Sequence, residues 1–482
     1  MSDQKFSPLK QVAKSRFLVF SILLHALLIV VGSGTVLFRY YVPTPDFNAS
    51  LGVLGEEAVP VAAPEQPLEF DPKKAEPKIP ELSAPAASAI TAVTSRVAPF
   101  ELTATTLQFL PTSEAFTFSG NPSTSPTPPS AGMGDRVPPT MASRMGGSAR
   151  RAAMLKNNGK EKSEVAVVNA LRWLKMQQNG NGSWCEKYPG AMTGLALLCY
   201  LGHGELPQSA EFGETVAKAV NWFNEQGAKF QGRLCMATSW GEGGAYSHAI
   251  GTYALCEYYT MTRDAAVVPL LRQAVQYIVD GQAYDGGWRY HYNSQVASDT
   301  SVTGWQIQAL KAAHLTDLGF PRIEESLDRA IVFLKGMQGE KGGFGYTEAK
   351  DGYSLAGVGA FCTFLWKQDR DPTVRKGVDF LLRAAESSSP VRYAGASANL
   401  YAWYYHTQAC LMYGGTVWDK WNRLFQDEIA DSQSPEGFWP PTGGTATGSL
   451  EEEPFLNGQV YRTTLCVLML EVFYRYMPLY KL

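Results

Sequence analysis

The chain has 482 residues and a formal net charge of −3, so it is long enough for two or three ordinary domains. A near-neutral balance excludes the strongly basic surface of most nucleic-acid-binding proteins, and we expect no nucleic-acid partner. Every Trp and Cys lies beyond residue 172, whereas Pro is concentrated between Pro43 and Pro139. The first third of the chain therefore has few residues that build a core, and the remainder is rich in them.

An apolar segment occupies residues 17–38, and His25 is its only ionisable side chain. It is long enough to cross the ~30 Å hydrocarbon layer and longer than the ~7–15 apolar residues of a cleavable signal peptide. Lys and Arg precede it, which predicts that residues 1–16 are cytoplasmic and that everything after the segment is periplasmic. We therefore expect a single-pass protein of the inner (cytoplasmic) membrane. A signal peptide cut near residues 32–35 is the alternative.

Ser21 and His25 are four residues apart, so they lie on the same face of the predicted membrane helix. An ionisable side chain inside a membrane is costly and is a functional candidate by default. This Ser-x-x-x-His pattern resembles the anchor of TonB-type energy transducers, in which a proline-rich spacer follows. The resemblance implies that Ser21 and His25 contact subunits of a proton-driven motor. The C-terminus departs from that family, because nothing there resembles a TonB receptor-binding domain.

Residues 39–163 form the predicted linker. They carry repeated Pro, Ala, Ser and Thr, as in the segment Pro126-Thr-Pro128-Pro129, and show no sustained apolar period. Such a composition cannot bury enough apolar surface to offset the loss of chain entropy on folding. We expect this linker to be disordered.

Residues 164–482 repeat a pattern of about 50 residues, which is typical of repeat architectures. Each unit has an amphipathic helix, a glycine-rich turn that ends in an aromatic residue, and a second, more apolar helix. Four turns begin with Gln178, Gln282, Gln338 and Gln433 and end with Trp184, Trp288, Phe344 and Trp439. The second and fifth units keep the helices, at 216–225 with 247–261 and at 374–385 with 400–413, but have degenerate turns.

The turn pattern has a physical basis. Glycine supplies the positive φ that a tight reversal after a helix needs, the aromatic ring packs over the helix ends, and the glutamine amide caps backbone groups. Apolar residues at helical spacing in both helices of each unit predict two buried faces. The sequence therefore predicts an all-α fold, an α/α toroid in which six helical hairpins close into a double ring.

The Gln-x-x-x-Gly-x-Trp turns resemble the repeats of squalene–hopene cyclases and, more broadly, of prenyltransferase and terpenoid cyclase toroids. The resemblance covers residues 164–482 and implies the toroid fold and an isoprenoid substrate. The segment from Asp299 to Leu310 also resembles an inner helix of a cyclase. Complement-type thioester domains share the architecture, but their Gly-Cys-Gly-Glu-Gln motif is absent from the sequence.

The residues that carry the chemistry of those families are not matched here. Class II cyclases protonate an alkene with the middle Asp of Asp-x-Asp-Asp, and this chain has Val296 and Ser298 where acids are required. In prenyltransferases an Asp and a Cys two residues apart, with a later His, hold zinc. Here Asp351 is followed by Tyr353, and Asp351 with His406 gives only two of the three protein ligands that catalytic zinc uses. We therefore expect no metal ion and no cofactor.

Candidate ligand-binding residues lie at the N-terminal ends of the second helices, which the resemblance places around the central mouth of the ring. Aromatic and polar residues at these positions in five hairpins are more typical of a ligand pocket than of a plain core, although each alone is compatible with a helix cap or a satisfied core group. Asp299 and His248 are the weak catalytic candidates. The set is Tyr246, His248, Asp299, Trp305, Tyr353, Trp403, His406, Tyr461 and Arg462.

Three functions remain open. The first is a membrane-anchored toroid that binds an apolar, isoprenoid-like or peptidic ligand without cyclase chemistry. The second is a divergent terpenoid cyclase or prenyltransferase, for which acids in the pocket would argue. The third is a TonB-like energised or scaffolding protein, for which a ring centre filled by side chains would argue.

Overall fold

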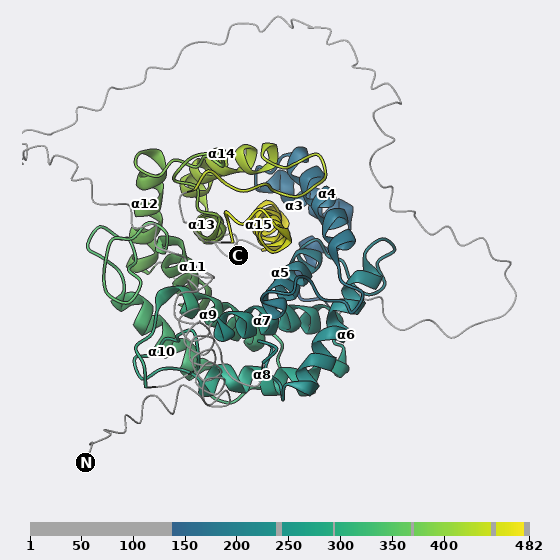
Figure 1. Cartoon of the computed structure of the whole chain (residues 1–482). Helices are drawn as coiled ribbons and strands as arrows, with labels where there is room; N and C mark the ends of the chain where they lie inside the picture. The colour runs from purple at the N-terminus through teal and green to yellow at the C-terminus, as the bar shows by residue number, and fades with distance from the viewer. Residues whose placement is uncertain (1–136, 238–242, 293–294, 368–370, 445–449, 477–482) are drawn as a thin grey trace, which may run out of the picture. The chain divides into compact units, whose positions relative to one another are not determined.

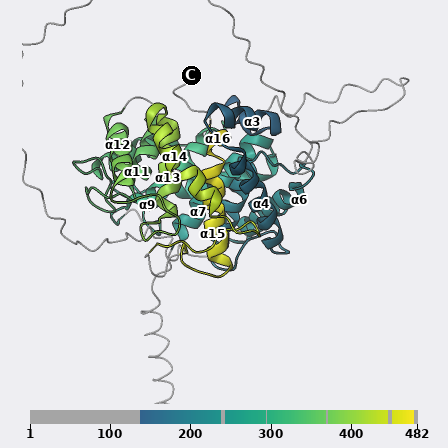
Figure 2. The same cartoon turned by 90° about the horizontal axis from the view of Figure 1, so that it is seen from above.

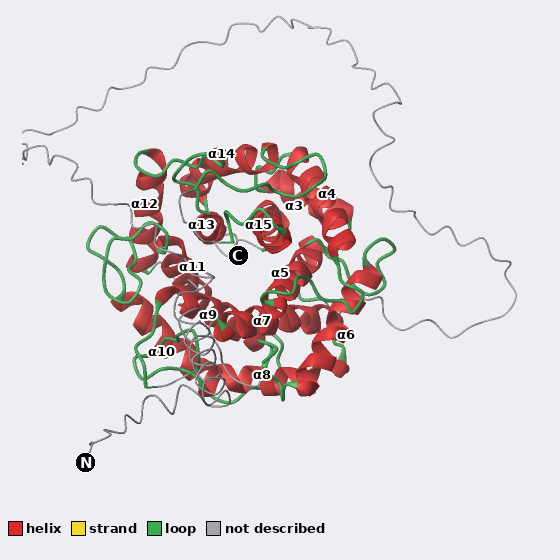
Figure 3. Ribbon diagram, viewed as in Figure 1, coloured by secondary structure: helices red, strands yellow, loops and turns green. Residues whose placement is uncertain are grey.

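The computed structural model describes residues 137–237, 243–292, 295–367, 371–444 and 450–476, and these belong to one compact unit. The predicted membrane segment with Ser21 and His25, and residues 39–136 of the predicted linker, lie outside the described residues. Within the described ranges, no helix is long and apolar enough to cross a membrane. The described elements are helices joined by turns and loops, with isolated β-bridges at Trp288–Asp299 and around Gln338 (Figure 3).

Two concentric rings of helices make up this part of the chain (Figure 1). The outer ring contains α4 (Glu161–Gln177), α6 (Gly213–Lys229), α8 (Val268–Asp280), α10 (Ile323–Gly336), α12 (Pro372–Glu386) and α14 (Gly415–Asp431). The inner ring contains α5 (Pro189–Gly202), α7 (Gly244–Thr262), α9 (Thr300–His314), α11 (Ala356–Lys367), α13 (Leu400–Tyr413) and α15 (Leu456–Leu470). The chain alternates between the rings, so each outer helix and the inner helix after it form one hairpin.

The ring is closed. Each inner helix packs against its two neighbours, and α15 completes the circle by packing against α5 and α4. The outer helices bury one face, whereas the inner helices are buried on nearly every side, because they contact the outer ring, both neighbours and the ring centre. The predicted all-α toroid of six hairpins is confirmed, including its closure.

Four short elements complete the described structure. They are η2 (Pro139–Arg144), α3 (Gly147–Lys156), η3 (Ala265–Val267) and α16 (Val472–Arg475). Figure 2 shows α3 and α16 together at one face of the ring. The Ser143 hydroxyl donates to the Tyr474 carbonyl (2.6 Å), and the Asn157 amide donates to the Phe473 carbonyl (2.6 Å). Residues 137–163 were expected to be linker, but these bonds to the C-terminal part of the chain order them as helices.

The glutamine-led turns join one hairpin to the next. In each, the glutamine Nε2 group donates to the glycine carbonyl four residues later and to a carbonyl in the first turns of the next outer helix, at 2.7–3.2 Å. The carbonyls reached by Gln178, Gln282, Gln338 and Gln433 belong to Thr215, Ser326, Thr373 and Ala166, respectively. The amide was expected to cap groups within its own hairpin, and it also links neighbouring hairpins. The bond from Gln433 to Ala166 lies at the closing joint.

Two structural constraints require glycine at one position in each of these turns. Gly182, Gly286, Gly342 and Gly437 have φ values between 95° and 108°, which side chains rarely adopt. A Cβ atom at these positions would also lie 2.3–2.6 Å from a carbonyl oxygen of the next outer helix. The glycine therefore allows two hairpins to approach closely at the same place where the glutamine bonds them.

The aromatic residue at the end of the turn packs as predicted. Trp184, Trp288 and Trp439 are fully buried, and the indole Nε1 of each donates at 2.8 Å to a carbonyl ten residues earlier, in the last turn of the outer helix. The same residue's backbone N–H donates to a threonine hydroxyl on the inner helix, as between Trp288 and Thr303 (3.0 Å). One tryptophan therefore fixes both helices of its hairpin.

We predict that Gly286→Ala destabilises the toroid by about 2–4 kcal/mol, because it combines a positive φ with a clash against the Arg329 carbonyl. Urea unfolding of the purified full chain measures this change. Gly336→Ala is the matched control, because a Cβ atom at Gly336, in α10, meets nothing within 4 Å. Equal unfolding midpoints for the two variants would contradict the role assigned to the turn glycines.

Candidate functional site

Aromatic and polar side chains of the inner helices contact one another inside the ring. The indole of Trp305 stacks on the ring of Tyr404, with centroids 5.4 Å apart. The Gln308 amide group donates to the Tyr405 hydroxyl (2.9 Å) and accepts from the Tyr404 hydroxyl (3.0 Å). The amide of Gln408 accepts from the Tyr476 hydroxyl (2.6 Å).

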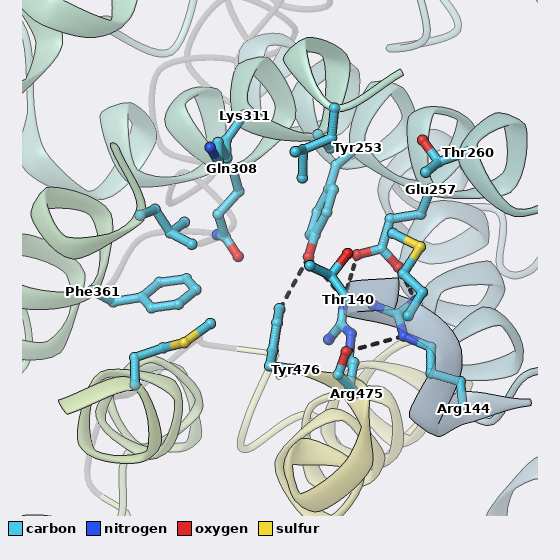
Figure 4. A pocket seen from close by; sticks show the side chains of 15 residues that line it. Thr140, Arg144, Tyr253, Glu257, Thr260, Gln308, Lys311, Phe361, Arg475 and Tyr476 are labelled. Atoms are coloured by element: carbon cyan, nitrogen blue, oxygen red, sulfur yellow. Dashed lines mark hydrogen bonds and ion pairs between the residues drawn. The ribbon is translucent and has the colours of Figure 1, made fainter. Parts of the chain in front are cut away.

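A pocket of about 140 Å³ adjoins these contacts, at the C-terminal ends of the inner helices (Figure 4). It is lined by residues from the C-terminal halves of α7, α9, α11 and α13, together with η2 and α16. Most of its wall is apolar. The apolar residues are Met141, Ala312, Leu315, Phe361, Leu365 and Met412.

A buried charged group borders the pocket. The Glu257 carboxylate, on α7, lies 2.8 Å from Nη1 of Arg144 in η2 and 3.6 Å from Nη2 of Arg475 in α16. Burial pushes the pKa of Glu257 upward, but the two guanidinium groups outweigh burial and hold that pKa below its usual value. Glu257 is therefore ionised at neutral pH and is unsuited to donate a proton.

Arg475 is the most unusual of these side chains. It is 0 % exposed, and its Nη2 group donates to the Tyr253 hydroxyl (3.0 Å), which in turn lies 3.0 Å from the Tyr476 hydroxyl. Its Nε and Nη1 groups have no hydrogen-bond partner among the described residues. A buried donor without a partner costs free energy, and both donor atoms are enclosed by the protein beside the pocket.

Lys311 is the third cation of the pocket wall. Its amino group lies 5.3 Å from the centre of the Trp366 ring, and no carboxylate forms an ion pair with it in the described part of the chain. Burial lowers its pKa. Sequence reasoning missed this pocket, although Glu257, Lys311 and Arg475 each interrupt an otherwise apolar run, which is the signal that marks them.

The predicted site residues lie in the N-terminal halves of the inner helices or in the turns before them, and none lines this pocket. Asp299 and Tyr246 are brought together through Ser301. Asp299 caps α9, because its Oδ1 atom accepts from Val302 N (2.8 Å) and from the Ser301 hydroxyl (2.6 Å), and the Tyr246 hydroxyl donates to Ser301 (2.7 Å). The Asp299 Oδ2 atom lies 4.0 Å from Nε of Arg289. Burial raises the pKa of Asp299 to about 6, against these hydrogen bonds.

His248 links the second hairpin to the third. Its Nδ1 atom accepts from Leu234 N (3.0 Å), and its Nε2 group donates to the Ala274 carbonyl on α8 (2.8 Å). Burial lowers its pKa to about 4, so the ring is neutral. His248 therefore accepts a bond from a backbone N–H group of the turn, as the inner-helix threonine does in the glutamine-led turns. It also donates to a carbonyl on the next outer helix, as the glutamine does in those turns. His248 therefore contributes to the scaffold, and its catalytic role stays a prediction.

His406 and Arg462 also hold turns in place. The His406 Nε2 group donates to the Tyr353 carbonyl (3.1 Å), and burial lowers the pKa of His406 to about 3. Arg462 donates to the carbonyls of Trp439, Leu450, Glu451 and Glu453 at 2.7–3.1 Å. The other candidates, Trp403 and Tyr461, are buried on α13 and α15.

The two residues considered for zinc are engaged separately. The Asp351 carboxylate accepts from the backbone N–H groups of Lys341 and Gly343 (3.0 Å), whereas His406 bonds the Tyr353 carbonyl. Within the described ranges, no three His, Cys, Asp or Glu side chains are grouped so that they could hold a metal ion.

Comparisons with known proteins give a partial match to a family of unknown function and similarity to remote solved structures. A domain of unknown function, DUF6288, matches residues 163–351, and no curated protein matches. The α-1,6-mannanase GH76A of Salegentibacter sp. HEL1_6, in an inactive variant, is similar at 11% identity, with 65% of this chain and 100% of that chain covered and a TM-score of 0.48. The type II terpene cyclase MstE of Scytonema, in its apo form, is similar at 14% identity, with 65% of this chain and 98% of that chain covered and a TM-score of 0.44.

We predict that stability falls as pH rises from about 4 to about 6, because folded Asp299 keeps a proton that an unfolded aspartate, with a pKa of about 3.9, releases in this range. Asp299→Asn keeps an oxygen that accepts from Val302 and cannot ionise. The free energy of unfolding of the variant should therefore exceed that of the wild type by up to about 3 kcal/mol at neutral pH. This difference should disappear near about pH 4.

Urea unfolding of the full chain across this range measures the difference, with Asp379→Asn, at a half-buried site on α12, as control. A constant gap between Asp299→Asn and wild type at all pH values would show that Asp299 does not titrate in the folded protein.

Proposed function

We propose that this protein is a membrane-tethered, periplasmic binding protein whose toroid holds the apolar part of a ligand in the pocket at the C-terminal ends of the inner helices. The observation that carries the proposal is the pocket itself, a largely apolar pocket of about 140 Å³ inside the ring. Polar groups stand at one side of this pocket, an arrangement typical of ligand sites.

The volume of the pocket limits the size of the group that it can hold. A dry engineered cavity of about 150 Å³ lined by Leu, Ile and Phe binds benzene. The pocket therefore accepts a group of about that size, such as one isoprenoid unit or a small aromatic ring. A folded triterpene is far too large for this volume, so the proposed ligand presents one end to the pocket.

The buried acids favour binding over cyclisation. Glu257 borders the pocket but is ionised by its two arginine partners, and Ser298 stands where a cyclase has its acid. The competing proposal, a divergent terpenoid cyclase or prenyltransferase, needs a protonated acid or a metal facing the bound ligand. Asp299 has a raised pKa, but it caps α9 and does not line the pocket.

Neutral apolar probes test the proposal. We expect indole to bind the full chain in detergent, as followed by isothermal titration calorimetry. Ala312 lies in the pocket wall, so Ala312→Leu should fill part of the cavity and weaken binding by at least about tenfold, or about 1.4 kcal/mol. Ala228→Leu, at an exposed site on α6, is the matched control. Equal affinities for the two variants, or no binding by the wild type, would refute the proposal.

A second proposal is that the tether acts on the pocket. We propose that residues 17–38 dock on a proton-driven motor of the inner membrane through His25, oriented by Ser21, and that the linker transmits force to the toroid. The observation that favours it is the position of η2, the first described helix after the linker. Thr140, Met141 and Arg144 of η2 line the pocket, and Arg144 bonds Glu257, so a pull on residue 137 would reach the pocket wall directly.

We expect His25→Leu to abolish co-purification with the motor subunits, because leucine suits the membrane but offers no ionisable group to the motor. Membrane insertion and toroid stability should not change. Affinity purification from membranes checks the first outcome, and carbonate extraction with thermal unfolding checks the second. Leu27→Ala, which changes an apolar side chain of the same segment and leaves His25 in place, serves as the control. Undiminished co-purification of His25→Leu would reduce the segment to a simple anchor.

A further inference from the structure

One part of the pocket wall comes from outside the two rings of helices. It is η2, which contributes Thr140, Met141 and Arg144. The inner helices that line most of the remaining wall are each packed between two neighbours, so they cannot move without opening the ring. The main neighbours of η2 are α3 and α16, which are short elements at one face of the ring. η2 can therefore leave the pocket while both rings stay intact.

We propose that η2 is a lid that opens and closes the pocket, with Gly146 and Gly147 as its hinge and the contact between Arg144 and Glu257 as its latch. This inference rests on the proposed binding pocket and states how access to that pocket is controlled. It goes beyond a path for force from the tether, because the lid opens by thermal motion without a pull.

The hinge lies between η2 and a point where the chain is firmly held. Gly146 has a φ of 87°, which favours glycine, and a Cβ atom at Gly146 or Gly147 would meet nothing within 4 Å. The far end of α3 is fixed, because the Asn157 carbonyl accepts from the Trp418 indole (2.9 Å) and the Asn157 amide donates to the Phe473 carbonyl (2.6 Å). Rotation about the two glycines would therefore move η2 and leave this end of α3 in place.

The latch is a carboxylate that two arginines share. Glu257 lies 2.8 Å from Nη1 of Arg144 and 3.6 Å from Nη2 of Arg475 (Figure 4). When Arg144 leaves, Glu257 keeps Arg475 as its partner, so opening does not leave this carboxylate unpaired. The Arg144 guanidinium regains water at the same time, and loss of that water is the main cost of a buried ion pair. The latch is therefore reversible, unlike a buried pair in which the carboxylate has a single cation.

The other contacts that hold η2 are mostly polar. The Ser143 hydroxyl donates to a carbonyl of α16 (2.6 Å), and Arg144 donates to the carbonyls of Arg475 (3.0 Å) and Leu201 (3.5 Å). Met141 and Arg144 are the buried side chains of η2. Water can replace the polar contacts when the lid opens, so the apolar surface that η2 exposes is chiefly that of Met141.

Hydrogen exchange of the full chain in detergent, followed by mass spectrometry, measures this opening without a ligand. The Met141 amide donates to the Pro138 carbonyl (2.8 Å), and the Met145 amide donates to the Ala142 carbonyl (3.1 Å). So short a helix is unstable in water, so these amides exchange once η2 leaves the ring. Their protection against exchange therefore reports how often the lid is open.

A variant of the latch locates the effect. Arg144→Met removes the charge and keeps an apolar side chain at the same place. We expect it to lower the protection of the η2 amides by at least about fivefold and to leave that of α7 and α9 unchanged, because Glu257 keeps Arg475. Arg151→Met, at an exposed site on α3, is the matched control and should behave as wild type. Arg144→Lys keeps a cation at the latch and should recover part of the protection.

The binding rates of indole test the control of access. A lid that must open first slows association, whereas a fixed wall affects dissociation alone. We therefore expect Arg144→Met to raise both the association and the dissociation rate of indole by at least about fivefold in stopped-flow measurements.

The outcomes separate the lid from the proposed function. Equal protection of η2 in Arg144→Met and Arg151→Met would overturn the lid. Loss of protection across α7 and α9 in Arg144→Met would also overturn it, because Arg144 would then hold the ring itself. An unchanged association rate of indole would count against the lid in the same way. Failure of indole to bind would instead refute the proposed function, and the exchange of η2 would still decide whether the lid opens.

Discussion

The close joint between neighbouring hairpins is the constraint on which the toroid depends. At four of the described joints a glutamine amide bonds two carbonyls, one in its own turn and one on the next outer helix, and a glycine beside it lets the two backbones approach. The amide satisfies carbonyls that otherwise face a tight interface, and the glycine removes the side chain that would hold the hairpins apart. Repetition of this joint fixes the rotation from one hairpin to the next, and the sum of these rotations closes the ring.

The same joint gives the ring two different ends. All the glutamine turns lie at the N-terminal ends of the inner helices. Carboxylates cap the helices there: Asp299 accepts from Val302 N, and Glu451 accepts from Leu400 N and Tyr401 N at 3.0 Å. At the other end the inner helices stop in shorter connections, and the ring is covered by η2, α3 and α16. The scaffold therefore fills one end with its own polar groups and leaves the pocket at the other.

The fold could be predicted from the sequence because its determinants are local. Gln282, Gly286 and Trp288 lie close together in the chain, and their roles follow from glycine conformation and indole packing. The same local logic selected Asp299, His248 and Arg462 as site candidates, and the structure shows these polar residues at helix starts bonding the turns. Their role in a site stays a prediction. The pocket depends on contacts such as that between Arg144 and the Arg475 carbonyl, 331 positions apart, and no local pattern encodes them. The membrane segment and its motor contact stay predictions.

Contacts between the two ends of the described chain also determine when the toroid can close during synthesis. The bond from Gln433 to Ala166 spans 267 positions, and Arg144 bonds Arg475 across 331. A chain made from its N-terminus therefore exposes the apolar flanks of α4 and α5 until α14 and α15 are made and cover them. Such long-range closure is slow, and unfinished intermediates aggregate. A nascent or truncated chain therefore lacks the seam that closes the toroid and the part of the pocket wall that Arg475 contributes, which leaves it open to proteolysis.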